Sequence, residues 1–338
     1  MPFHSRPAAF VRRIRFKWDM LAVLWFILGV FASRPGACAV AVSRLERFEY
    51  SQAAMGVRAR MVVYAPNRAS AESACKRAFA RIARLEDVMS DYRPTSELMR
   101  LCAKAGGPAV KVSRDLLKVL LKAQEISRLS DGAFDVTVGP LVKLWREARA
   151  TRKMPDESRL CSARELVGWR KLEIDAKNAT VRLKYPGMLL DLGGIAKGYA
   201  CDEALRTLKR CGINRALIEM GGDIALGDPP PGKKGWLVQI PAAQADERCS
   251  QLANCGVSTS GDAEQFVEIN GRRYSHIVDP RTGLGLTHRA EVTVIAPDCT
   301  TSDCLATAAS VLGPEKAAQW MRRYFPRVRL YVRPAADG

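Results

Sequence analysis

The sequence predicts an α+β fold in a single domain, with mixed sheets and flanking helices. Helical and strand patterns both occur along the chain, but they do not alternate in the strict strand–helix–strand order of a doubly wound sheet. The composition, 48% hydrophobic and 26% charged residues, is that of a globular protein with an ample core. We find no linker long or flexible enough to separate two domains.

The expected elements follow from local periodicity. Residues 50–65 alternate as one strand that places Ala59, Met61 and Val63 on one face. Apolar residues at helical spacing predict helices over residues 69–89 and 115–129, the second behind Ser113 as an N-cap. Further helices are expected at residues 137–149, 195–211, 301–312 and 314–324. Further strands are expected at residues 171–174, 180–184, 215–219, 236–240, 265–269 and 291–296. The Pro/Gly/Lys-rich segment 228–235 is expected to form an exposed hairpin loop.

The first 39 residues resemble a secretory signal. Four basic residues between positions 12 and 17 precede a 13-residue apolar run at 20–32, and Ala37 and Ala39 offer a cleavage site for small residues. The run is short for a membrane span, which needs about 20 apolar residues; an uncleaved membrane anchor is the alternative. We therefore expect residues 1–39 to be a signal peptide or anchor and residues 40–338 to be the functional domain. The protein is then exported, either periplasmic or attached to the inner membrane facing the periplasm.

Charge and cysteine spacing exclude some classes of function. Without residues 1–39 the chain keeps 47 Arg and Lys against 34 Asp and Glu, a net charge of +13. A basic surface suits nucleic acid, an acidic membrane or a phosphate-rich ligand, or only keeps the protein soluble. No zinc-finger or RNA-recognition signature supports nucleic acid. The ten cysteines include no CxxC pair, which argues against zinc-ribbon and thioredoxin-like proteins.

Two glycine-containing segments have the composition of a nucleotide site. In residues 130–141, Phe134 can cover a ring and Asp135 can accept hydrogen bonds, although a simple loop with a buried Phe134 explains the same residues. In residues 190–202, a strand enters a helix through Gly193 and Gly194. That turn presents free N–H groups to an anion, with Lys197 as a nearby cation. A turn without a ligand is the alternative.

Two later segments offer acid–base and metal chemistry. His276 lies in the segment 274–283 with Asp279 and Arg281, which suits proton transfer or phosphate binding; a structural turn is the alternative. Asp303 and Thr307 are four residues apart on an expected helix and so share a face. A carboxylate, a hydroxyl and backbone carbonyls suit Mg²⁺. Helix capping by Asp303 and packing by Thr307 is the alternative.

Taken in order, these segments resemble the ApbE family of FAD:protein FMN transferases. The matching motifs are residues 55–56, 89–92, 96–98, 132–135, 139–141, 191–199, 221–223, 259–262, 276–283 and 303–307. They span residues 50–313, nearly the whole mature chain. The chain departs from the family in having Cys102 where asparagine is usual, and in Cys201, Cys299 and Cys304 within or beside core motifs.

The resemblance implies an α+β fold with FAD in a central cleft and Mg²⁺ bridging its pyrophosphate. It implies flavin-nucleotide contacts by Met55, Tyr92, Ala133, Phe134, Asp135, Asp191, Lys197 and Ile277. It implies metal ligation by Asp303 and Thr307 with backbone oxygens of Gly194 and Ala306. His276 and Asp303 are the catalytic residues that it implies.

The resemblance also implies the reaction and its partners. FMN passes from FAD to a threonine of an acceptor flavoprotein, a subunit of a membrane redox complex, and AMP leaves. Two alternatives remain open: a Mg²⁺-dependent pyrophosphatase that splits FAD to FMN and AMP, and a non-catalytic flavin-binding assembly protein. Intact His276, Asp303 and Thr307 argue against the latter. No nucleic-acid partner is expected, whereas membrane association through the N-terminus is.

Overall fold

A computed structural model describes residues 44–261 and 265–334. The predicted signal or anchor, residues 1–39, and Asp262 of the family motif at 259–262 lie outside the described residues. The described residues belong to one compact unit. None of their helices is long and apolar enough to cross a membrane.

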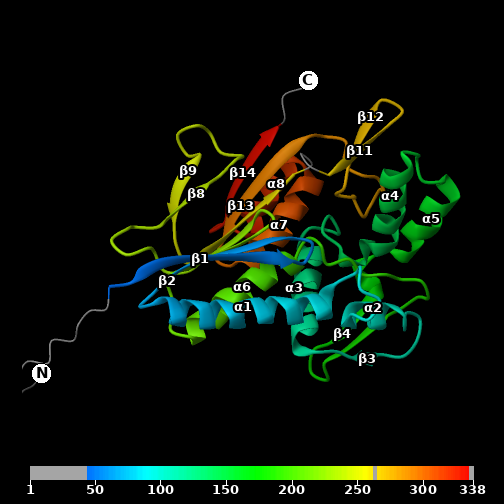
Figure 1. The fold of residues 1–338 in the computed structure, drawn as a ribbon. Coiled ribbons are helices and arrows are strands. Elements are labelled where there is room, and N and C mark those ends of the chain that lie inside the picture. Colours follow the sequence, from blue (N-terminus) through cyan, green and yellow to red (C-terminus); the bar gives the residue numbers. More distant parts are fainter. Residues whose placement is uncertain (1–43, 262–264, 335–338) are drawn as a thin grey trace, which may run out of the picture. The chain divides into compact units, whose positions relative to one another are not determined.

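The central element is a seven-stranded sheet in the order β1-β2-β6-β7-β10-β13-β14 (Figure 1). Every neighbouring pair in it is antiparallel, which confirms the α+β class. Its strands are β1 (Glu46–Ala54), β2 (Val57–Ala65), β6 (Ala216–Met220), β7 (Asp223–Leu226), β10 (Cys255–Ser260), β13 (Ala290–Ala296) and β14 (Arg329–Pro334).

The inner strands of the sheet bury side chains on both faces, and successive side chains point to opposite faces. In β2, Met61 and Val63 face the main core, whereas Val62 faces a second core shared with Trp236. Trp236 belongs to a separate hairpin, β8 (Trp236–Gln239) with β9 (Cys249–Leu252). The hairpin therefore covers the face of the sheet opposite to the main core.

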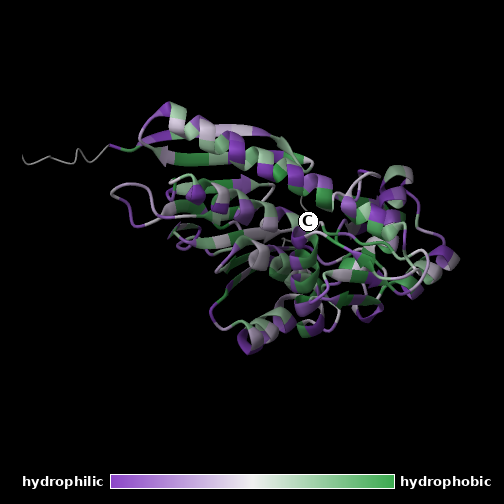
Figure 2. Cartoon of the chain, turned by 90° about the horizontal axis from the view of Figure 1, so that it is seen from below, coloured by the Kyte–Doolittle hydropathy of each residue, from purple (hydrophilic) through white to green (hydrophobic). Residues whose placement is uncertain are grey.

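Helices cover the other face of the sheet (Figure 1). α1 (Arg68–Met89) packs on β1 and β2, α6 (Ala196–Arg210) on β6 and β7, and α7 (Cys299–Leu312) on β10 and β13. Hydrophilic and hydrophobic residues alternate along the helices (Figure 2), as expected where each helix buries one face. α3 (Arg114–Leu129) and α8 (Pro314–Tyr324) pack against α7.

Smaller elements complete the fold around this core. The helices are α2 (Glu97–Cys102), α4 (Gly139–Thr151) and α5 (Glu157–Leu166), with short 3-10 turns η1 (Val136–Val138) and η2 (Trp169–Lys171). The strands are β3 (Val110–Lys111), β4 (Leu172–Asp175), β5 (Thr180–Leu183), β11 (Phe266–Ile269) and β12 (Arg272–Ser275). A third apolar cluster joins α4, α5 and the β11–β12 hairpin, and Trp145 lies at its centre.

The structure confirms most of the expected elements to within a few residues. The long helices form as predicted, and the Ser113 side chain accepts from the N–H of Leu116 at the start of α3. The single strand expected at residues 50–65 is wrong. Met55 (φ 50°) and Gly56 (φ 76°) take left-handed conformations, and the chain reverses there into the β1–β2 hairpin.

The segment 228–235 is not a hairpin loop. It follows β7, which pairs with β6 and β10, and leads to β8, which pairs with β9 in another sheet. Local composition shows a turn but not the partner of each strand.

The described cysteines all carry free thiols.

α6 and α7 cross closely, and Gly198 makes the crossing fit. A Cβ at position 198 would lie 2.3 Å from the Cys299 carbonyl oxygen and 2.8 Å from the Cβ of Asp303. Alanine normally stabilises a helix by about 1 kcal/mol over glycine. Here we expect Gly198→Ala to destabilise the protein by about 2–3 kcal/mol, because backbone must move to admit the methyl group.

Urea unfolding measures this change. Lys209→Ala, at an exposed position of the same helix, serves as the control and is expected to shift stability by less than about 0.5 kcal/mol. A Gly198→Ala variant as stable as the wild type would refute the close crossing.

Candidate functional site

Two turns and the end of strand β10 meet at one end of the central sheet. The β2–β6 register pairs Ala59 with Met220, so the β1–β2 turn lies beside the β6–β7 turn. A Cβ at Gly221 would lie 2.9 Å from Val57 Cγ1, and the N–H of Thr259 donates to the Gly222 carbonyl at 3.0 Å. These three segments therefore bring the motifs around Met55, Asp223 and Thr259 to the same end of the sheet.

The turn that leads into α6 brings two predicted site residues together. A Cβ on Gly194 would lie 2.8 Å from Thr307 Oγ1 and 3.2 Å from Phe134 Cε2. Glycine at 194 thus lets the Thr307 hydroxyl approach the backbone that precedes α6. The N–H of Gly193 donates to Asp191 Oδ1 at 2.8 Å, which fixes the start of this turn.

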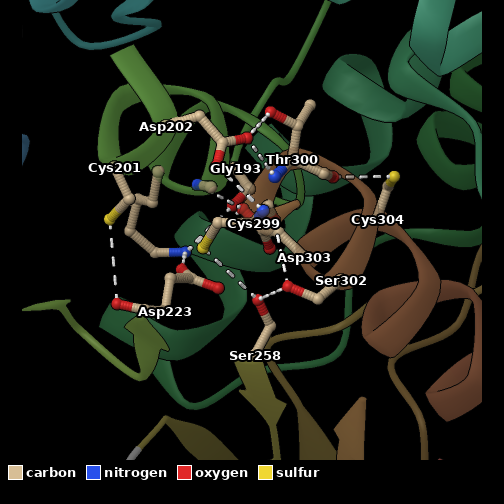
Figure 3. Close-up of polar contacts among 12 residues, drawn as sticks. Gly193, Cys201, Asp202, Asp223, Ser258, Cys299, Thr300, Ser302, Asp303 and Cys304 are labelled. Atoms are coloured by element: carbon tan, nitrogen blue, oxygen red, sulfur yellow. Dashed lines mark hydrogen bonds and ion pairs between the residues drawn. The ribbon is translucent and has the colours of Figure 1, made fainter. Parts of the chain in front are cut away.

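Lys197 connects the sheet to both helices. Its Nζ donates to Asp223 Oδ2 at 2.7 Å and lies 3.9 Å from Asp303 Oδ2. Figure 3 shows Asp223 and Asp303 turned toward the same centre. Burial alone lowers the pKa of Lys197, but the two carboxylates outweigh it and raise that pKa. Lys197 is therefore a fixed positive charge.

Asp303 is buried between α6 and α7. Its Oδ2 accepts from the N–H of Gly198 at 3.0 Å, a first-turn donor of α6 that has no partner within its own helix. Burial and then the nearby Asp223 raise the pKa of Asp303 to about 7, although Lys197 and the Gly198 N–H oppose the shift. A divalent cation would compete strongly with the proton for this carboxylate.

The surrounding polar groups hold α7 in place. Asp202 of α6 accepts from the N–H groups of Cys299 and Thr300 at 3.0 and 2.8 Å. The hydroxyls of Ser258 and Ser302 are 2.8 Å apart and join β10 to α7 (Figure 3). Asp303 and Thr307 project from a helix that is thus fixed at its N-terminal end.

The four groups predicted to bind metal fit Mg²⁺ by their chemistry. Asp303 supplies one carboxylate, Thr307 one hydroxyl, and Gly194 and Ala306 backbone carbonyls, an all-oxygen set with few protein ligands. The contact between Gly194 and Thr307 joins two of these residues, one from the turn before α6 and one from α7. In residues 44–261 and 265–334, no group of three or more His, Cys, Asp and Glu is placed to hold a metal. A zinc-type site is therefore not formed by these residues.

The 130–135 loop is more tightly packed than a ligand loop needs to be. Ala133 and Phe134 are buried, and Phe134 belongs to the main core. Asp135 Oδ1 accepts from both the N–H and the hydroxyl of Thr137. Asp135 is thus the N-cap of the 3-10 turn η1. Burial raises the pKa of Asp135, and the bonds from Thr137 oppose the shift. The local alternative, a loop with a buried Phe134, describes this packing, while Phe134 still contacts the Gly194 turn.

The remaining predicted residues lie around this cluster in different segments. Met55 occupies the β1–β2 turn. His276 follows β12, and its Nδ1 lies 3.1 Å from the Gln265 carbonyl oxygen, while Ile277 accepts from the N–H of Leu286. Tyr92 and Asp191 both contact Arg146. The hydrogen bonds and close approaches around Asp303 in the described residues do not include Met55 or Ile277.

Sequence reasoning missed the roles of Asp223, Asp202 and Arg146. The segments singled out in the sequence contain Asp223 and Asp202, but neither was named as a site residue. Nothing local indicates that Asp223, the first residue of β7, pairs with Lys197, or that Asp202 accepts from the N–H groups at the start of α7. Arg146 follows the motif residue Trp145 on a basic helix, so its charge alone did not distinguish it.

The raised pKa of Asp303 predicts how the folding stability depends on pH. Between its ordinary value of 3.8 and about 7, the folded state binds a proton that the unfolded state releases. Stability therefore falls as pH rises through this window. Asparagine does not titrate and keeps an oxygen for the Gly198 N–H. We expect metal-free Asp303→Asn to be more stable than the wild type at pH 8 by about 1–2 kcal/mol, and by less at pH 5.

Thermal unfolding in EDTA at the two pH values tests this. A variant that is less stable than the wild type at pH 8 would contradict the proposed cost of the buried charge.

Comparison with known proteins supports the same family from the whole chain. The sequence profile described as "ApbE family" matches residues 55–332. A protein named FAD:protein FMN transferase from Haemophilus influenzae is 34% identical over 263 residues, covering 74% of this chain and 76% of the relative. A protein of the same name from Treponema pallidum is 32% identical and covers 94% and 91%.

Solved structures agree with the sequence comparison. The flavin transferase ApbE from Vibrio cholerae superposes with a TM-score of 0.76 at 31% identity, covering 87% of this chain and 95% of that protein. The antiparallel sheet, the Gly194–Thr307 contact and the partly buried Lys197–Asp223 pair thus occur in a chain whose sequence and fold both match known flavin transferases. The chain belongs to the ApbE family.

Proposed function

We propose that this protein transfers FMN from FAD to a threonine hydroxyl of an acceptor flavoprotein and releases AMP. The observation that carries the proposal is the cluster of Lys197, Asp223 and Asp303 beside the Gly194–Thr307 contact. It combines a fixed cation, an oxygen set for a metal and the N-terminus of α6 within one small region. Such a combination suits a pyrophosphate. The names of the relatives agree with this activity.

The reaction is a transfer of a phosphoryl-type group. The threonine oxygen forms a bond to the phosphorus of the FMN half, and the bond from that phosphorus to the oxygen of the AMP phosphate breaks. The proton of the hydroxyl passes to a base, and AMP leaves with the electron pair. Catalysis of such a step depends on positioning and on offsetting negative charge.

The residues of this chain have separate parts in that step. The positive charge of Lys197 and the positive end of the α6 dipole attract the phosphates. Asp303, Thr307 and the carbonyls of Gly194 and Ala306 would hold Mg²⁺, which when bound offsets charge on the pyrophosphate. Phe134, Tyr92, Asp191 and the other predicted contacts would hold the rest of FAD in the central cleft.

His276 is the proposed base. Its Nδ1 lies 3.1 Å from the Gln265 carbonyl oxygen, which can only accept a hydrogen bond. In the neutral ring the proton is therefore on Nδ1, and Nε2 carries the lone pair that can take a proton. This tautomer suits general-base catalysis on a threonine hydroxyl.

Mass spectrometry of an acceptor protein tests the activity. Residues 40–338 are incubated with FAD, Mg²⁺ and an acceptor domain that carries a flavinylation threonine. We expect the acceptor to gain the mass of one FMN, with AMP released in equal amount, and EDTA to stop both. AMP with free FMN and an unlabelled acceptor would support the pyrophosphatase instead. FAD binding without turnover across several acceptors would support the non-catalytic binding protein.

Point variants separate the proposed roles in the same assay. We expect Asp303→Asn to lower the transfer rate at least about 100-fold through loss of the carboxylate ligand. We expect His276→Gln to lower it about 100-fold or more while FAD still binds. His288→Gln is the matched control, because the His288 ring contacts the Ser310 carbonyl at the end of α7. Equal losses in His276→Gln and His288→Gln would argue against a special role for His276.

We further propose that residues 1–39 direct export, and that the acceptor is a subunit of a membrane redox complex facing the periplasm. The basic residues at 12–17, the apolar run at 20–32 and the small residues Ala37 and Ala39 support this. The family match begins only at residue 55. When the full chain is expressed in a bacterium with a periplasm, we expect the exported form to begin at Val40. Intact chain that stays in the cytoplasm would contradict the proposal.

A further inference from the structure

Arg146 joins two residues that are 99 positions apart in the sequence and that are both predicted to contact FAD. It lies on α4, and its guanidinium carbon is 4.3 Å from the centre of the Tyr92 ring. One of its NH₂ groups lies 2.6 Å from Asp91 Oδ2 and 3.1 Å from Asp191 Oδ2. One side chain therefore makes a cation–π contact and two ion pairs at the same point.

Arg146 lies over the Tyr92 ring. The residue is 75% exposed, an unusual value for a large aromatic residue next to a buried core. The flat guanidinium covers part of the ring and restrains its orientation. Much of the ring surface remains open to a planar ligand group. An aromatic ring that is fixed and yet exposed is a suitable stacking platform.

Asp191 is fixed by two donors. Its Oδ1 accepts from the N–H of Gly193 at 2.8 Å, and its Oδ2 accepts from Arg146 at 3.1 Å. Burial and the neighbouring Asp91 raise the pKa of Asp191, whereas Gly193 and Arg146 act in the opposite direction. Arg146 thus connects the Tyr92 ring to the turn in which Gly194 approaches Thr307.

We propose that Arg146 is a positioning residue for FAD, which holds the Tyr92 ring and the Asp191 carboxylate in the arrangement that receives the flavin nucleotide. The inference rests on the proposed function for the identity of the ligand. A lysine would keep the charge but lacks the planar face that covers the Tyr92 ring. The role assigned to Arg146 is in binding and not in the transfer step itself.

Equilibrium binding of FAD without any acceptor tests the proposal, with Mg²⁺ present and flavin fluorescence as the signal. We expect Arg146→Met to weaken FAD binding by about tenfold or more, and Arg146→Lys to lie between it and the wild type. In the transfer assay we expect KM for FAD to rise in parallel, while kcat at saturating FAD changes by less than about threefold.

Lys143→Met is the matched control. Lys143 lies one turn earlier on α4 and is exposed, so its loss removes the same charge from the same helix. We expect it to weaken FAD binding by less than about threefold. Equal losses in Lys143→Met and Arg146→Met would reduce the effect to general electrostatics and overturn the proposal.

A double variant distinguishes loss of the Arg146 contacts from repulsion between Asp91 and Asp191, the two carboxylates with which Arg146 pairs. Arg146→Met leaves Asp91 and Asp191 without their shared cation, so we expect it to lower the stability of the protein. Adding Asp91→Asn removes the repulsion, and we expect the double variant to regain stability while its FAD binding stays weak. Recovery of wild-type FAD binding in the double variant would overturn the proposal. Wild-type protein that binds FAD but labels no acceptor would refute the proposed transferase and leave the role of Arg146 intact.

Discussion

The structure depends on a reciprocal hydrogen-bonded contact between α6 and α7. Asp202 of α6 accepts from the N–H groups that open α7, and Asp303 of α7 accepts from the N–H of Gly198 in the first turn of α6. Each helix thus supplies the carboxylate that satisfies donors at the start of the other, which would otherwise be buried without partners. Gly198 allows the two backbones to approach closely enough for both contacts. This contact sets where Asp303 and Thr307 stand relative to the turn at Gly194.

The same contact concentrates charge in a buried place. Asp223 and Asp303 both lie near Lys197, so two carboxylates share one ammonium group. Burial of charge costs free energy that such pairing offsets only in part, which accounts for the raised pKa of Asp303. A divalent cation and a pyrophosphate would add charges of both signs to this cluster. The arrangement is thus better suited to binding ligands than to stabilising the empty fold, as often holds at functional sites.

The sheet brings the other parts of the site into reach. Its antiparallel pairing places the β1–β2 turn, the β6–β7 turn and the end of β10 side by side, while Arg146 ties the segments of Tyr92 and Asp191 together. Each segment alone is a short motif in a turn or at a helix end. This convergence places motifs that are spread along the chain in one region of the fold.

The sequence by itself determined the class of fold, the long helices and the family, because hydrophobic periodicity, caps such as Ser113 and ordered motifs are local properties. It also singled out Gly194, Lys197, Asp303 and Thr307 as candidates. Only the tertiary structure decided that residues 50–65 form a hairpin, that Asp223 holds Lys197, and that Arg146 joins Tyr92 to Asp191. The physical reason is that these are contacts between segments distant in the chain. Which carboxylate meets which cation depends on sheet register and on the α6–α7 crossing, and neither leaves a local trace in the sequence.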